Sequence, residues 1–241
     1  MSLDALKEII AKSENIVFFG GAGVSTESNI PDFRSESGLY KSKNKFSYPP
    51  EKMLSHSFFE SHTEEFYEFY KEKMIFKDAK PNKAHYSLAE LEKRGKLKAV
   101  ITQNIDGLHQ KAGSKNVLEL HGSIHRNYCT KCGKFFDLDY IINSSDGIPK
   151  CDSCGEVIKP DVVLYEEPLN MDVIDNAVKY VSNADVLIIG GTSLVVYPAA
   201  GLVDYYKGNK LVLINKSSTP YDRRADLVIN DSIGEVLSSV I

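Results

Sequence analysis

Four cysteines are the residues of this chain whose spacing most directly indicates a chemistry. They form two C-x-x-C pairs separated by 18 residues, Cys129 with Cys132 and Cys151 with Cys154. This spacing is typical of a zinc site with four thiolate ligands. Two disulfides are the alternative, but we find no secretion signal and expect a reducing compartment, which disfavours them. Because four protein ligands leave no open coordination position, we expect one structural zinc ion.

A second group of polar residues follows strand-like segments. "TQNIDGLHQKAG" comes after "KAVI", "HGS" after "VLEL", "GGTSL" after "DVLII", and Asn215 after "LVLI". Buried polar groups need hydrogen-bond partners, so packing alone explains these clusters poorly. Open α/β sheets bind ligands at the carboxyl ends of their strands. The pattern therefore predicts that these clusters meet at one crevice.

A glycine-rich turn, "GGAGVSTES" at residues 20–28, follows the apolar segment "IVFF". We expect it to open a helix, whose N-terminus and backbone amides can hold a phosphate, which favours a dinucleotide site over a mere tight turn. The dehydrogenase fingerprint G-x-G-x-x-G is not met, because Thr26 occupies the third glycine position counted from Gly21. Hydride transfer is therefore weakly supported.

The elements that must position these residues alternate along the chain. "NIVFFG", "KAVIT", "NVLEL", "DVLIIG", "KLVLIN" and "DLVIN" are strand-like, and Asn82 to Arg94, closed by Gly95, has the pattern of a capped helix. This alternation predicts an α/β fold with a parallel sheet. The segments 36–80 and 122–163 do not fit it, so we expect them to be a helical and a zinc-binding insertion that form a smaller lobe.

Composition excludes several classes of protein. The 241 residues carry a net charge of −4 with both signs interspersed, so we expect no direct binding of nucleic acid and no membrane association. The N-terminal residues have the pattern of an amphipathic helix rather than of a signal peptide, which indicates a cytoplasmic protein. Gly-Gly, Thr-Ser and Tyr-Pro interrupt the uncharged segment 186–203, so we expect a strand, a turn and a helix start there.

Five motifs in order carry a resemblance to a known family. "GAGVSTESNIPDFR", "TQNIDGLHQKAG", "LHGS", the paired C-x-x-C and "GGTSLVVYP" resemble those of sirtuins, the NAD-dependent protein-lysine deacylases. The resemblance spans Ile16 to about Ile233. It implies a Rossmann-like NAD-binding domain at 1–35, 81–121 and 164–241, and a small domain made of the two insertions. We expect a monomer.

The resemblance also implies a reaction. Acetyl, and other uncharged acyl groups, would be removed from lysine side chains of proteins or peptides, with release of nicotinamide and O-acyl-ADP-ribose. Two alternatives remain open: an NAD-dependent protein ADP-ribosyltransferase, and a non-enzymatic zinc-ribbon binding module.

The same resemblance assigns site residues. The implied NAD contacts comprise the glycine turn, the Asp-Phe-Arg segment and the strand-end clusters: Gly21, Ala22, Thr26, Asp32, Phe33, Arg34, Gln103, Asn104, Ile105, Asp106, His121, Gly191, Thr192, Ser193, Asn215 and Ile233. The implied substrate contacts are Tyr67, Val163, Tyr165, Glu166 and Val195. The implied catalytic residues are His121 and Asn104.

Histidine is the residue type suited to the proton transfer that this reaction needs. A ribose hydroxyl must lose a proton before it attacks the acyl carbon, and a base with a pKa near neutrality suits that step. Of six histidines, His121 alone follows a strand end directly and precedes a glycine. His85 and His109 lie in helix-like segments, where we expect them to be core residues.

Three departures from the sirtuin pattern bear on structure or specificity. Asn29 replaces a glycine, and asparagine tolerates a positive φ better than most residues. Tyr165 and Glu166 stand where the family commonly has Phe-Gly, so Glu166 would favour basic residues beside the acylated lysine.

Desuccinylating sirtuins typically carry Tyr-x-x-Arg in the helical insertion; here Tyr67 matches the tyrosine and Tyr70 the arginine. We expect Lys71 and Lys73 on other faces of that helix.

Overall fold

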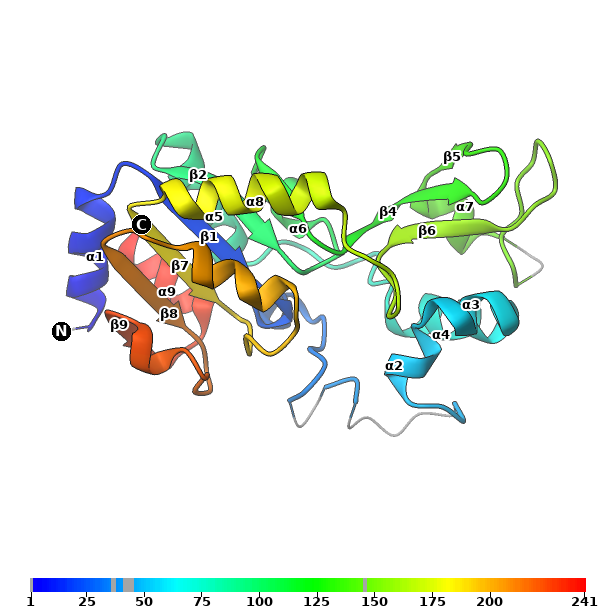
Figure 1. The fold of residues 1–241 in the computed structure, drawn as a ribbon, viewed down its shortest axis with the longest axis horizontal. Coiled ribbons are helices and arrows are strands. Elements are labelled where there is room, and N and C mark those ends of the chain that lie inside the picture. Colours follow the sequence, from blue (N-terminus) through cyan, green and yellow to red (C-terminus); the bar gives the residue numbers. More distant parts are fainter. Residues whose placement is uncertain (1, 36–37, 41–45, 145–146) are drawn as a thin grey trace.

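A computed structural model describes residues 2–35, 38–40, 46–144 and 147–241. Its larger sheet has six parallel strands in the order β3-β2-β1-β7-β8-β9 (Figure 1). Their bounds are β1 Ile16–Gly20, β2 Leu97–Thr102, β3 Val117–Glu119, β7 Val186–Gly190, β8 Lys210–Ile214 and β9 Leu227–Ile229. Numbered within this sheet, the order is 3-2-1-4-5-6, that of a doubly wound Rossmann-like sheet. All six predicted strands are confirmed.

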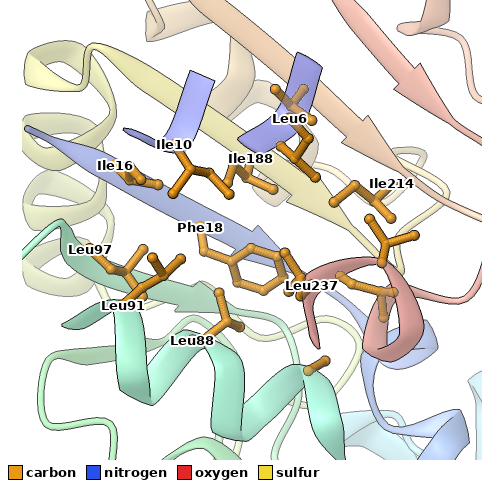
Figure 2. Close-up of a cluster of buried hydrophobic side chains, with 14 of the residues drawn as sticks. Leu6, Ile10, Ile16, Phe18, Leu88, Leu91, Leu97, Ile188, Ile214 and Leu237 are labelled. Atoms are coloured by element: carbon orange, nitrogen blue, oxygen red, sulfur yellow. The ribbon is translucent and has the colours of Figure 1, made fainter. Parts of the chain in front are cut away.

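The central strands are apolar on both faces because helices cover both faces. In β1, Phe18 packs into a cluster with helices α1 (Ser2–Lys12), α5 (Lys83–Lys93) and α9 (Ile233–Val240), as Figure 2 shows. Phe19 points the opposite way, toward α8 (Met171–Asn183) and the 3-10 helix η3 (Ala199–Tyr205). This arrangement explains why the strands are continuous hydrophobic runs rather than alternating ones.

A smaller lobe lies at the far end of the molecule from α1 (Figure 1). Its sheet is antiparallel, with the order β5-β4-β6, and its helices share one core with that sheet. The elements are β4 Gly122–Cys129, β5 Phe135–Phe136, β6 Ile158–Val162, α2 Pro50–Met53, α3 His56–Ser61, α4 Thr63–Lys73 and α7 Leu138–Ile142. Parts of both predicted insertions, 36–37, 41–45 and 145–146, lie outside the described residues.

The glycine-rich turn is built differently from the prediction. Two 3-10 turns, η1 (Ala22–Val24) and η2 (Thr26–Ser28), follow β1 where we expected an α-helix. The second turn ends at Asn29, whose φ of 62° reverses the chain before Pro31. Asparagine thus adopts the left-handed conformation expected of a glycine replacement. The helix N-terminus expected to hold a phosphate is therefore absent from these residues.

Other local expectations are confirmed. Helix α5 begins after Asn82, whose side chain accepts a hydrogen bond from the backbone N–H of Ala84, and Gly95 beyond its end has a φ of 74°. The uncharged segment 186–203 forms β7, a turn and the start of η3. Among the described residues, no helix is both long enough and apolar enough to span a membrane. The remaining short elements are α6 (Leu108–Ala112) and η4 (Asp222–Arg224).

Candidate active site

A cavity of about 770 Å³ runs along the carboxyl ends of the parallel strands. These ends lie side by side: Gly20 of β1 pairs with Thr102 of β2 and with Gly190 of β7, and Gly190 pairs with Ile214 of β8. The strand order reverses between β1 and β7, which is where doubly wound sheets bind ligands. The cavity extends past this edge to the small lobe, where Leu54 and Tyr70 line it.

The structure brings nearly all the residues expected at the site to this cavity. Those that line it are Gly21, Ala22, Thr26, Asp32, Phe33, Arg34, Gln103, Asn104, Ile105, Asp106, His121, Val163, Tyr165, Glu166, Gly191, Thr192, Ser193, Asn215 and Ile233. Val195 and Tyr67 are not among the lining residues. Val195 is 47% exposed, and its neighbour Val196 lines the cavity instead.

The glycines of the turn allow two loops to approach each other closely. A Cβ atom at Gly23 would lie 2.7 Å from the Cα atom of Gly191, and one at Gly21 would lie 2.8 Å from the Cβ atom of Thr192. The Gly23 N–H donates to the Gly191 carbonyl at 2.8 Å, and the Gly21 N–H to the Gly190 carbonyl at 3.3 Å. These two amides therefore join the loops to each other. The loops can approach this closely because the residues at the contact are small.

A chain of amide contacts crosses the floor from β2 to β8. The Gln103 Nε2 atom donates to Thr192 Oγ1 at 3.1 Å, and the Thr192 N–H donates to Asn215 Oδ1 at 2.9 Å. The Asn215 Nδ2 atom is buried and has no hydrogen-bond partner among the described residues. A buried donor without a partner is costly. Its place on the cavity wall suits a ligand acceptor such as a nucleoside oxygen.

Ser25 connects two of the expected residues, and it was not among the residues assigned from the sequence. The Asn104 Nδ2 atom donates to Ser25 Oγ at 3.1 Å and to the Gly21 carbonyl at 3.1 Å. The Ser25 hydroxyl donates to Asp106 Oδ2 at 2.6 Å, and Asp106 Oδ1 accepts from the Leu108 N–H at 2.9 Å. Asn104 and Asp106 are thus held in fixed orientations. Ser25 lies within the glycine motif, but that motif does not indicate which hydroxyl is used.

His121 follows β3 after Leu120 and lines the cavity. Its Nδ1 atom lies 3.0 Å from the carbonyl oxygen of Gln103. A carbonyl oxygen only accepts hydrogen bonds, so Nδ1 carries the proton and Nε2 keeps its lone pair. Burial lowers the pKa of His121 from its ordinary value, and the hydrogen bond to Gln103 partly opposes that shift. The imidazole is therefore neutral, and able to accept a proton, at pH 7.

The Asp-Phe-Arg segment forms the part of the wall between the two lobes. The Asp32 carboxylate accepts the backbone N–H groups of Arg34 at 3.1 Å and Ser35 at 2.8 Å, which shapes the turn. The Phe33 ring packs edge-on against Tyr40 with 5.7 Å between centroids, and the Arg34 guanidinium lies 5.6 Å from the Tyr40 ring centre. An aromatic and cationic wall of this kind can exclude water from the interior of the cavity.

Residues 163–167 form a strap between the main sheet and the small lobe. The Val163 N–H donates to the His121 carbonyl at 3.0 Å, and Tyr165 exchanges backbone hydrogen bonds with Leu54 and His56. Glu166 has a φ of 78°, which explains why a glycine suits this position. Its carboxylate accepts the N–H of Ser57 at 2.9 Å and the Ser57 hydroxyl at 3.0 Å. The carboxylate expected to meet a substrate cation is therefore already engaged with α3.

Helix α4 also differs from the prediction. Tyr67 is fully buried, and its hydroxyl donates to the Ile158 carbonyl of the small sheet, so it is held away from the cavity. Tyr70, one turn on, lines the cavity together with Lys73. We expected Lys73 on another face, but positions three apart share a face of a helix. Lys71 does point elsewhere, because its ammonium donates to Ser144 Oγ at 2.7 Å and to the Gly147 carbonyl at 3.2 Å.

The four cysteines converge at the tip of the small lobe. All four Sγ atoms lie within 4.8 Å of one another, and three of the pairs are 3.4, 3.6 and 3.7 Å apart. A tetrahedral zinc ion with Zn–S bonds of about 2.3 Å separates its sulfurs by about 3.8 Å. Backbone N–H groups of Cys132 and Ser153 point at the sulfurs of Cys129 and Cys151, which stabilises thiolates. The donor set thus fits zinc.

A loop after β8 also lines the cavity and was missed from the sequence. Asn215 was assigned, but the following residues 216–219 reach the same wall. Their composition, Lys-Ser-Ser-Thr, is ordinary for a surface loop. Only their position after a strand end that meets the switch point could have indicated them.

Comparisons with known proteins agree with this geometry. Residues 21–198 match the profile of the Sir2 family. The chain is 75% identical over 236 residues to the NAD-dependent protein deacetylase of Clostridium tetani (strain Massachusetts / E88), covering 98% of this chain and 96% of that protein.

Two solved structures are similar over the whole chain. One, a Sir2 variant with a deacetylated p53 peptide and 3′-O-acetyl ADP-ribose, is 42% identical with a TM-score of 0.91 over 100% of this chain and 97% of that chain. Another, a Sir2 protein with a p53 peptide and NAD+, is 41% identical with a TM-score of 0.87 over 100% and 97%. On its fold, its site and these matches, the chain belongs to the Sir2 family.

Proposed function

We propose that this protein is an NAD-dependent protein-lysine deacetylase, which removes acetyl and other uncharged acyl groups from lysine side chains of proteins. The observation that carries the proposal is that one cavity joins a dinucleotide-type sheet edge, a neutral buried histidine and the strap of residues 163–167. The deacetylase of Clostridium tetani and the peptide complexes of similar proteins support it.

NAD binds across the sheet edge as a co-substrate in this proposal. The glycine turn and Thr192 would hold the pyrophosphate, and Asn215, whose buried Nδ2 atom needs an acceptor, would hold the adenosine. The nicotinamide end lies near Asp106, enclosed by Phe33. These residues orient the dinucleotide so that the bond between ribose and nicotinamide faces the substrate lysine.

The residues of this chain act on that bond by position and by proton transfer. Loss of nicotinamide builds positive charge on the ribose, and the acyl oxygen of the substrate attacks there. Phe33 and Tyr40 exclude the water that would otherwise hydrolyse the sugar. His121 then accepts, at Nε2, the proton of a ribose hydroxyl, which attacks the acyl carbon. The bond from that carbon to the lysine nitrogen then breaks, the lysine leaves as a protonated amine, and one water molecule supplies the oxygen that completes O-acyl-ADP-ribose. Asn104, held by Ser25, hydrogen-bonds the ribose and fixes its orientation.

Zinc has a structural role in this proposal. Cys129, Cys132, Cys151 and Cys154 supply all four ligands, so the ion cross-links the tips of the small lobe. We also propose that residues 1–35, 81–121 and 164–241 form the NAD-binding domain, and that 36–80 and 122–163 form the small domain. A zinc site of four thiolates is consistent with a cytoplasmic location, where thiols stay reduced.

One assay separates this function from its alternatives. The protein is incubated with NAD and a peptide that carries one acetyl-lysine, and nicotinamide and intact masses are followed. A deacetylase releases nicotinamide only when the peptide is present, and the peptide loses one acetyl mass. Addition of an ADP-ribose mass to protein would instead identify a transferase. A protein that only binds partners would release no nicotinamide under either condition.

A further inference from the structure

The hydroxyl groups of Tyr40 and Tyr165 meet at the wall of the cavity. Their Oη atoms lie 2.7 Å apart, in a hydrogen bond for which either phenol can be the donor. Both residues line the cavity, and Tyr165 is 42% exposed, so the bond lies on the solvent side of that wall. Tyr165 is also one of the departures from the sirtuin pattern, which commonly has phenylalanine there. The hydroxyl that makes this contact is therefore the atom by which this chain differs.

The Asp-Phe-Arg segment moves with Tyr40, because several contacts join them. The Tyr40 N–H donates to the Phe33 carbonyl at 3.0 Å. The Leu39 N–H donates to the Asp32 carbonyl at 2.8 Å. The Phe33 and Tyr40 rings pack edge-on, and the Arg34 guanidinium lies over the Tyr40 ring. A displacement of the Tyr40 side chain therefore disturbs the position of Phe33.

The strap holds Tyr165 against the small lobe. Its N–H donates to the Leu54 carbonyl at 2.9 Å, and its carbonyl accepts the N–H of His56 at 3.0 Å. These two bonds fix the backbone of Tyr165 on both sides. The hydroxyl pair thus ties the Asp-Phe-Arg segment to a fixed point on the strap. Phenylalanine at position 165 would keep the ring and lose the tie.

The bond between the two phenols adds direction to packing that is already present. Phe33 and Leu39 belong to the apolar cluster of the small lobe, but apolar contact does not select one orientation of a ring. Burial raises the pKa of Tyr40 well above its ordinary value, and the hydrogen bond to Tyr165 adds to that shift. The Tyr40 phenol therefore keeps its proton at neutral pH, and the bond is available there.

We propose that Tyr165 is a positioning residue that suppresses hydrolysis of NAD, because its hydroxyl holds Tyr40 and Phe33 in the wall that excludes water. This inference rests on the proposed deacylase function and concerns the side reaction that the same site must prevent. In that side reaction, a water oxygen bonds to the anomeric carbon of the ribose in place of nicotinamide and gives up one proton to solvent. The products are ADP-ribose and nicotinamide, and the acyl group stays on the lysine.

The expected effect is modest. The net value of one hydrogen bond shifts the equilibrium between the placed and the displaced position of Phe33 by about 2- to 10-fold. Water reaches the sugar from the displaced position, so hydrolysis should rise by about the same factor when the bond is lost. Attack by the acyl oxygen uses the placed position. The fraction of NAD that is hydrolysed is therefore the quantity that the bond controls.

The test measures nicotinamide and deacetylated peptide in one reaction with saturating NAD and an acetyl-lysine peptide. The excess of nicotinamide over deacetylated peptide, divided by total nicotinamide, is the hydrolysed fraction. The wild type is compared with Tyr165→Phe, with Tyr40→Phe and with the double variant. Tyr86→Phe is the matched control, because Tyr86 of α5 is 55% exposed and is not one of the described residues that line the cavity.

Each single variant should raise the hydrolysed fraction by about 2- to 10-fold. The double variant should match the single variants, because either change breaks the same bond. Tyr86→Phe should match the wild type. A general loss of stability lowers both products in proportion and leaves the hydrolysed fraction unchanged. This readout therefore distinguishes a positioning role from a merely structural one.

Three outcomes overturn the role of the pair and leave the proposed function standing. The first is a hydrolysed fraction that neither single variant changes. The second is an increase in only one single variant, which shows that its hydroxyl acts without the other. The third is a double variant whose increase equals the product of the two single increases, which shows that the hydroxyls act independently. Absence of deacetylated peptide in the wild-type reaction overturns the proposed function, and this inference with it.

Discussion

The Nδ1 atom of His121 lies 3.0 Å from the carbonyl oxygen of Gln103, which fixes the tautomer of the imidazole. Because Nδ1 must donate to the carbonyl, the free lone pair is on Nε2. Gln103 also joins β2 to the β7 loop through Thr192. The strand edge that lines the cavity therefore also orients the His121 imidazole. In the proposed function this one strand edge contributes both to NAD binding and to proton transfer. Mutation of single residues can distinguish the two contributions.

Replacing His121 by alanine should affect chemistry more than binding. We expect His121→Ala to lower kcat by about 10²- to 10⁴-fold, the usual scale for loss of a general base, with little change in the Kd of NAD. The Kd is measured by titration and kcat by nicotinamide release with saturating acetyl peptide. Burial lowers the pKa of His121 from its ordinary 6.5, so the imidazole is neutral at pH 6.5 and above. Wild-type activity should therefore fall only when the pH drops below 6.5. Wild-type turnover in the variant would refute the assignment.

The cysteine cluster should contribute to the stability of the small lobe when zinc is bound. Cys132→Ala removes one of four ligands, so we expect loss of bound zinc, a lower Tm and lower deacetylase activity. Zinc content is measured by atomic absorption. Ser153→Ala is the matched control, because Ser153 lies in the second C-x-x-C turn and, within the described part of the chain, its side chain bonds only Lys134 and Asp152. Full zinc content with unchanged Tm in Cys132→Ala would contradict a structural metal.

Two buried histidines should make the protein sensitive to acid. The rings of His85 and His109 lie 4.7 Å apart, and burial lowers the pKa of His85 to about 4 and that of His109 to about 3. The unfolded chain binds protons on both near pH 6.5, so the folded state binds fewer protons below that pH. The stability that their neutral forms contribute is therefore present above pH 6.5 and is lost as pH falls toward 3–4.

Urea unfolding at several pH values between 7.5 and 4.5 tests this expectation. Below about pH 6.5, each such histidine adds about 1.4 kcal/mol per pH unit to the slope of the unfolding free energy. His109→Phe keeps an aromatic ring beside Phe18 and should reduce the slope by about that amount. If the variant and the wild type lose stability at the same rate, the buried pair is not the cause.

Local patterns predicted the sheet well because each central strand is a short apolar run with a turn at its end. The carboxyl ends of such strands meet at one edge, so Gln103, His121 and Thr192 could be placed together without a structure. The convergence of the four cysteines follows from their spacing in the same way. In each case the decisive information lies within a few residues of the site.

Other features depend on contacts between distant segments, which no local pattern specifies. A Cβ atom at Gly23 would collide with Gly191, so only glycine fits there. The glycine turn is thus needed for packing between the two loops as much as for a ligand. Glu166 bonds Ser57 although it stays exposed to solvent, since the strap lies across the start of α3. The side of α4 that meets the cavity is set by the packing of the small lobe. For this reason Tyr70 and Lys73 line the cavity and Tyr67 does not.

The chemistry of the wall around Tyr70 predicts how the enzyme treats a charged acyl group. A succinyl carboxylate that enters an apolar cavity needs a cation, and an unpaired charge there costs several kcal/mol after relaxation. Lys73 lines this wall, but its ammonium lies 3.0 Å from Glu72 and its side chain is 25% exposed. Moving that cation to the acyl group would break an existing pair. We therefore expect acetyl to be removed in preference to succinyl.

The measurement is kcat/KM on one peptide that carries acetyl-lysine or succinyl-lysine, with an expected ratio of at least about 100 in favour of acetyl. Tyr70→Arg places a cation where the structure shows a phenol, so it should raise the succinyl value and narrow that ratio. Lys73→Met is the matched variant: it should leave the low succinyl value unchanged, because Lys73 does not serve the acyl group. A wild-type succinyl value equal to the acetyl value, lost in Lys73→Met, would show instead that Lys73 leaves Glu72 and binds the carboxylate.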